Sequence, residues 1–305
     1  MKKLIKADIM YMLVSKSFLW ICILFAFFLV AHSWMSYDYV CRSFRQYEKT
    51  YNYMIEVDAN IDEQLDIDYI IHDDGSIENP LSFFKEQLEK SVSAIHPNNL
   101  FTNFAESCTL FLPIIAVLVA IVLVSYDEKN KTARLKITRN GKFCFDFSKQ
   151  ITGIVFMSFI ILLALVFFVF LNLVVYNKIK SSFDITIVER FFFGSNNIFY
   201  QMLYTFLVAI IFFEIGYTIS NVFHCYTAIA VIITIYSFWA KPIFKFDPIN
   251  LKCCFESKIF NFEGVVSATS PIPISSASAI IMVIVIMMIL LCFNLLALTK
   301  KSAFN

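Results

Sequence analysis

Six apolar runs, separated by polar stretches of very unequal length, dominate the sequence. Each run is close to the roughly 20 residues that a helix needs to cross a bilayer. Helices are expected because lipid offers backbone N–H and C=O groups no partners, and because barrel strands would alternate in polarity. The sequence therefore predicts an all-α membrane protein with six transmembrane helices, at residues 18–36, 105–125, 151–176, 199–220, 226–242 and 277–298.

The charged residues between these runs predict which side of the membrane each segment faces. Hydrophobic residues make up 59% of the chain and charged residues only 16%. Alternate segments together hold 13 Lys and Arg in 53 residues, namely 1–17, 126–149, 221–225 and 299–305. The remaining three hold 11 in roughly twice that length, namely 37–104, 177–198 and 243–276. By the positive-inside rule, the first set is cytoplasmic, with both termini inside.

The N-terminal segment 1–17 carries apolar residues at helical spacing, among them Leu4, Ile9 and Met12. It predicts an amphipathic helix in the inner interface, the alternative being a simple extension of the first span. No small-residue cleavage site follows the first run, so we expect an anchor that stays in place and not a cleaved signal peptide.

The segment 37–104 predicts an acidic, helical outer domain, with 13 Asp and Glu against 5 Lys and Arg. Helices are expected at 53–71 and at 80–95, where Pro80 suits a first helical position. The acidic clusters lack the alternation of an EF-hand loop. These clusters would bind Ca²⁺ or a cationic peptide, or they would simply form a solvated acidic face.

The remaining segments predict one further ordered element. In the cytoplasmic loop 126–150, a short helix from about 128 to 138 would end at Asn140-Gly141. Such a helix suits a groove on a cytosolic partner, although a basic loop that merely retains the chain inside is the alternative. The other connections are an outer loop at 177–198, a tight turn at 221–225, an outer hairpin at 243–276 and a tail at 299–305.

Few residues suggest chemistry. Glu214 is the one clear acid inside a predicted span, where it would line a substrate path or a chain–chain interface, or be bonded to Tyr217 or Thr218. Cys41 and Cys108 would face the oxidising side, where they would form a disulfide or serve as small apolar residues. No Cys/His metal pattern and no Walker A motif occur, so we expect no metal, no ATP site and no enzymatic activity in this chain.

The order of elements resembles that of the ABC-2 type permeases, the membrane subunits of one class of ATP-binding-cassette transporters. Family members carry an acidic residue, then Gly-Thr, an Arg segment, and a Lys that enters the third span. Glu128, Thr132, Arg139 and Lys149 fit these places, while Lys131 stands where Gly is usual. The resemblance covers essentially the whole chain.

The resemblance implies that a separate nucleotide-binding subunit, carrying ATP and Mg²⁺, contacts the 128–140 segment. The implied contact residues are Glu128, Thr132, Arg134, Arg139 and Lys142, with Asn221 and His224 as lesser contacts. It also implies a second permease chain, identical or homologous, and a place in a bacterial cytoplasmic membrane among its lipids. No nucleic-acid partner is expected.

The expected function is therefore coupling of a partner's ATP hydrolysis to export of a peptide-like or amphipathic substrate, such as a peptide toxin, bacteriocin or antibiotic. This substrate class rests on the long outer domain by analogy alone. The alternative is a non-transporting receptor or scaffold whose acidic outer domain binds a ligand. An intramembrane enzyme would need paired catalytic groups at one depth, and only Glu214 is visible.

Overall fold

The structure is a computed structural model of residues 1–305. It describes all of them except 58–59, 194–197, 224–225, 240, 261–270 and 304–305. The α-helices are α1 (Lys2–Val14), α2 (Lys16–Glu56), α3 (Ile61–Asp66), α4 (Pro80–Ile95), α5 (Leu100–Lys129), α6 (Ala133–Asn140), α7 (Lys142–Ser182), α8 (Ile198–Phe223), α9 (Tyr226–Trp239), α10 (Pro248–Ile259) and α11 (Ser276–Ala303). Short 3-10 turns, η1 and η2, lie at Pro97–Asn99 and Ile185–Ile187.

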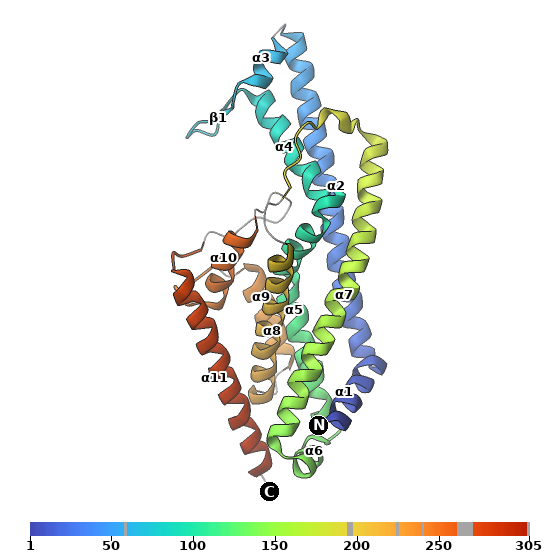
Figure 1. Ribbon diagram of the computed structural model, residues 1–305, viewed down its shortest axis with the longest axis vertical. Helices are drawn as coiled ribbons and strands as arrows, with labels where there is room; N and C mark the ends of the chain where they lie inside the picture. The colour runs from blue at the N-terminus through green and yellow to red at the C-terminus, as the bar shows by residue number, and fades with distance from the viewer. Residues whose placement is uncertain (58–59, 194–197, 224–225, 240, 261–270, 304–305) are drawn as a thin grey trace.

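The molecule is elongated, and its long helices run along the longest axis (Figure 1). Five helical stretches in the described part of the chain are long and apolar enough to cross a membrane: Lys16–Glu56, Pro97–Lys129, Lys142–Ser182, Ile198–Phe223 and Ser276–Ala297. The chain is thus of the all-α membrane type that the sequence predicts. The remaining predicted span, 226–242, corresponds to α9, whose described apolar stretch Tyr226–Tyr236 is shorter.

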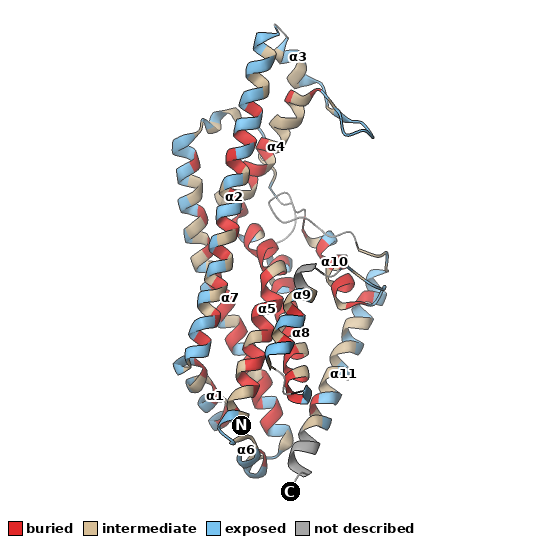
Figure 2. Ribbon diagram, turned by 180° about the vertical axis from the view of Figure 1, so that it is seen from behind, coloured by how far each residue is buried: buried red, intermediate tan, exposed pale blue. Residues whose placement is uncertain are grey.

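Helix α5 is the central element of the bundle. In its most apolar window 83% of residues are buried, against 11% for the window in α11 (Figure 2). Helix α8 approaches α5 very closely, because Gly216 has no Cβ that would meet the Cα of Val117. Gly153 of α7 likewise leaves room for the ring of Phe213 on α8. Small residues at these crossings let membrane helices pack backbone against backbone.

Helices α2 and α7 do not end at the predicted membrane boundary. Each continues unbroken for 41 residues, which is about 60 Å at 1.5 Å per residue and about twice the hydrocarbon thickness. The predicted boundary at residue 36 therefore falls within a helix. Apolar side chains are also buried beyond this boundary: Val40, Phe44 and Ile179 belong to a second hydrophobic core.

That second core lies at the end of the molecule away from α6, where α4 packs along α2 (Figure 1). The predicted helix at 80–95 is confirmed, with Pro80 in the first turn and the Asn79 side chain accepting from the Ser82 amide. The predicted helix at 53–71 is wrong. The described part contains only the end of α2, the short α3, and a hairpin.

In this hairpin, β1 (Ile70–Ile71) pairs antiparallel with β2 (Ile77–Glu78). Its turn places Gly75 at φ 83°, a left-handed conformation that glycine adopts without strain and that a helix excludes.

The predicted N-terminal helix is also present, as a separate element. Helix α1 ends at Val14, and the hydroxyl of the next residue, Ser15, accepts from the Phe18 amide and so caps the start of α2. Leu4, Asp8 and Met12 form its buried face. This spacing of four residues places Asp8, a charged residue, on the face that packs against the bundle.

Candidate functional site

The end of the molecule that contains α6 holds the candidate site, and both chain termini lie at this end (Figure 1). Helix α6 ends at Asn140, followed by Gly141 at φ 81°, as the sequence predicts. Its start differs from the prediction, because α5 runs to Lys129 and α6 begins only at Ala133. Glu128 is therefore a residue of α5, and its carboxylate accepts a hydrogen bond from Tyr226 of α9.

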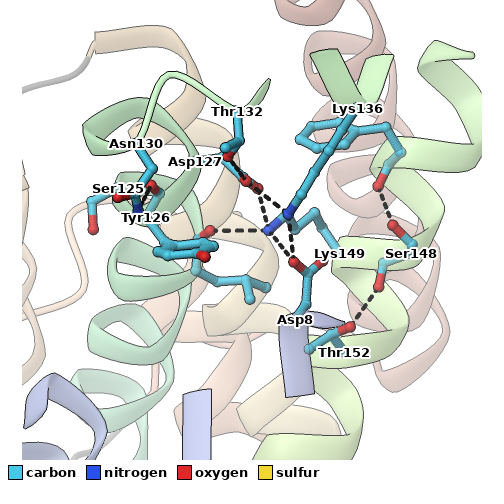
Figure 3. Close-up of polar contacts among 12 residues, drawn as sticks. Asp8, Ser125, Tyr126, Asp127, Asn130, Thr132, Lys136, Ser148, Lys149 and Thr152 are labelled. Carbon is cyan, nitrogen blue, oxygen red and sulfur yellow. Dashed lines mark hydrogen bonds and ion pairs between the residues drawn. The ribbon is translucent and has the colours of Figure 1, made fainter. Parts of the chain in front are cut away.

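A network of two carboxylates and two ammonium groups lies behind α6 (Figure 3). Lys136 Nζ lies 2.9 Å from Asp8 Oδ1 and 2.8 Å from Asp127 Oδ1. Lys149 Nζ lies 3.1 Å from Asp8 Oδ1 and also pairs with Asp127. The four side chains come from α1, α5, α6 and α7, so one cluster of charges joins four helices.

The network is almost closed to solvent. Asp8, Asp127 and Lys149 are 1–2% exposed. Burial lowers the pKa of Lys136, but its bonds to the two carboxylates outweigh burial and raise the pKa above the ordinary value. The ring of Tyr126 lies 5.4 Å from one ammonium group and 6.0 Å from the other, which adds cation–π attraction.

Thr132 is half-buried and belongs to this network. Its hydroxyl donates to Asp127 Oδ1 at 2.6 Å, immediately before α6 begins. Its contact with a partner stays a prediction. Its role in the structure is to fix the connection between α5 and α6.

The outward face of α6 is polar and exposed. Arg134, Thr138 and Arg139 are exposed, and Leu135 has 72% of its surface accessible. The opposite face carries Ile137, which packs with Phe145 and Ala133 in a small core. Lys142, at the start of α7, is half-buried. A partner that reached this end would meet α6 before any other helix of the site.

The lesser contacts predicted at 221–225 are not surface groups where they are described. Asn221 is 5% exposed, and its amide donates to Asn294 of α11 at 3.5 Å. His224 lies outside the described residues. Asn221, near the end of α8, is therefore a buried side chain that packs helices together.

Glu214 is buried in α8, 3% exposed, and its carboxyl group is not the partner of the Tyr217 or Thr218 hydroxyl. Tyr217 donates instead to Asp146 Oδ1 at 2.9 Å, and Thr218 donates to the backbone carbonyl of Glu214 at 2.8 Å. Glu214 lies close enough to Asp146 for their charges to interact. Asp146 was not among the predicted site residues, and its only signal is an acid four residues before Gln150, which also donates to it.

Two further expectations concern cysteines and metals. Cys41 and Cys108 are free thiols, so the considered disulfide is absent and the reading as small apolar residues holds. Both are buried, and Cys108 lies in the main core on α5. Among the described residues, no group of three or more His, Cys, Asp or Glu is placed to hold a metal ion.

Lys131 provides a test of the connection before α6. It adopts φ 55°, a left-handed conformation that costs an L-residue about 1–2 kcal/mol. We expect Lys131→Gly to raise the free energy of unfolding by about 0.5–1 kcal/mol, because the extra freedom of glycine in the unfolded chain offsets part of the relief. Thermal unfolding in detergent measures this. Lys129→Gly, in the last turn of α5, is the control and should be destabilising.

Searches against family models, curated proteins and solved structures give no match, so the candidate site rests on its own geometry.

Proposed function

We propose that this chain is the permease subunit of an ATP-binding-cassette transporter, in which a separate nucleotide-binding subunit docks on α6. One observation carries the proposal. A short helix with an exposed outer face is joined from behind, by a buried charge network, to α1, α5 and α7. A loop that served only to hold positive charge inside would need no such anchorage.

The network suits a coupling role because of its connectivity. Lys136 is the α6 member of the network, and it contacts both Asp8 and Asp127. Lys149 contacts the same two carboxylates from α7. A displacement of α6 by the partner therefore moves three other helices together, because separating any of these buried charges is costly.

The backbone at Lys131 also supports the resemblance to ABC-2 type permeases. Glycine is usual at this position in that family, and Lys131 adopts a backbone conformation that favours glycine. In the proposed arrangement α9 is the fifth of six spans, both termini are cytoplasmic, and two permease chains assemble in a bacterial cytoplasmic membrane. ATP and Mg²⁺ bind the partner, and the exported substrate is peptide-like or amphipathic.

The test is co-purification of partners from native membranes in mild detergent, with an ATPase assay. We expect an ATP-binding subunit to accompany the chain. Because Leu135 and Arg139 are on the exposed face of α6, Leu135→Asp with Arg139→Glu should remove at least nine-tenths of that subunit, as interface substitutions of about 1.4 kcal/mol each change affinity tenfold. Arg190→Glu, an exposed arginine on the outer side, is the matched control.

Two outcomes would contradict the proposal. If the wild-type chain purifies without any ATP-binding subunit, the alternative of a receptor or scaffold with an acidic ligand-binding outer domain becomes the better account. If the subunit is present but binds the α6 variant and the Arg190→Glu control equally well, α6 is not its docking site. A thermal unfolding curve for each variant separates lost docking from lost folding.

A further inference from the structure

An apolar hollow of about 240 Å³ lies between α8, α10 and α11. Leu207 and Ile211 of α8, Phe255 of α10, and Ile280 and Ile284 of α11 are among the residues that line it. A second hollow of about 330 Å³ shares Leu207 and Phe255 with the first. Helix α11 contacts the inner end of the bundle and diverges from α8 towards its own N-terminal end (Figure 1). The two hollows therefore form one track along α8.

The track has the length and direction of a lipid chain. Its α8 residues recur every three or four positions from Tyr200 to Ile215, which places them on one face of the helix. This stretch is about 22 Å long at 1.5 Å per residue. It starts at the outer end of α8, so it extends through the outer half of a hydrocarbon core about 30 Å thick and somewhat beyond its middle.

Basic side chains lie at the mouth of the track, in contrast to the acidic segment 37–104. Lys258 lines the second hollow, is exposed, and donates to the Ser276 hydroxyl, which holds its ammonium group at the start of α11. Lys252 lines the first hollow but is paired with Glu256 at 3.4 Å. Residues 241–260 contain four Lys and two acids, whereas 37–104 has an excess of acids. Lys258 is thus the cation best placed for an anionic head group.

We propose that this track is a binding site for an anionic phospholipid of the outer leaflet. One acyl chain lies in the hollow between α8, α10 and α11, and the phosphate meets Lys258 at the mouth. The apolar lining suits the chain, because van der Waals packing is the main attraction between apolar groups inside a bilayer. The exposed cation gives the head group its selectivity. The site is independent of whether α6 binds a nucleotide-binding subunit.

Native mass spectrometry of the full chain in detergent, titrated with phosphatidylglycerol or with phosphatidylcholine, tests the proposal. We expect the wild type to prefer phosphatidylglycerol about tenfold, the effect of one hydrogen bond to a charged group. Lys258→Gln should remove that preference, and Lys245→Gln, an exposed lysine outside the track, should keep it. Ile284→Trp should fill the hollow and weaken both lipids about tenfold, whereas Ile281→Trp, on an exposed face outside the hollow, should not.

Equal affinity of the wild type for the two lipids, or an unchanged preference in Lys258→Gln, would overturn the assignment of the head group. Unchanged binding in Ile284→Trp would overturn the assignment of the hollow. If Ile284→Trp does not fold, Leu207→Trp fills the same hollow from the α8 side and replaces it. A loss of binding in Ile281→Trp equal to that in Ile284→Trp would also count against the hollow.

Discussion

Replacing Lys149 by Met should lower the free energy of unfolding by about 3–5 kcal/mol, the usual cost of removing one partner from a buried ion pair. Lys149 is 2% exposed and contacts both Asp8 and Asp127. Without it, two buried carboxylates would share the single ammonium group of Lys136. The measurement is the unfolding midpoint of the purified chain in detergent, together with its level in membranes.

A second substitution distinguishes a charge effect from a packing effect. Asp8→Asn in the Lys149→Met background removes one of the uncompensated charges, so it should recover stability, with a coupling energy of about 0.5–3 kcal/mol. Lys90→Met removes a half-buried lysine paired with Glu86, outside the network, and should cost less than about 1 kcal/mol. If Lys149→Met costs no more than Lys90→Met, the network does not stabilise the fold.

The two close helix crossings should respond differently to the same substitution. Gly216→Ala would place a Cβ 2.9 Å from the Cα of Val117, and Gly153→Ala would place one against the ring of Phe213. Each variant should lower the free energy of unfolding by about 1–3 kcal/mol, the typical cost of overpacking a core. The new methyl group meets a backbone atom in Gly216→Ala and the end of a side chain in Gly153→Ala.

The second-site variants follow from that difference. Phe213→Leu should compensate Gly153→Ala, because it removes the atoms that the new methyl group meets. Val117→Ala should not compensate Gly216→Ala, because the Val117 Cα remains in place. Double-mutant cycles of thermal unfolding free energies measure both couplings. Equal coupling at the two crossings would contradict the close approach of α8 to the α5 backbone.

The sequence predicted the elements that depend on local pattern. Long apolar runs locate the membrane helices, and Pro80 and Gly141 mark a helix start and a helix end that the structure confirms. The extension of α2 past residue 36 could not be predicted in this way, because its residues become amphipathic while the helix continues. What stabilises it is the second core around Phe44 and Val92, which forms only when α4 packs on α2.

The sequence predicted where along the chain the candidate site lies, but not which residues form the buried charge network. Arg134 and Arg139, which the family resemblance implied as contact residues, are exposed on the short helix that the sequence predicted. The network behind them joins residues as distant as Asp8 and Lys136, 128 positions apart, and no local pattern indicates such a pairing. For the same reason, the sequence did not indicate that the Thr132 hydroxyl donates to Asp127.

The unbroken α2 and α7 make the two ends of the molecule mechanically dependent on each other. Helix α7 carries Lys149 in the network near its start and Ile179 in the second core near its end. A tilt of about 5° at one end of a helix about 60 Å long displaces the other end by roughly 5 Å. A small rotation that begins beside α6 would therefore become a larger displacement at the second core.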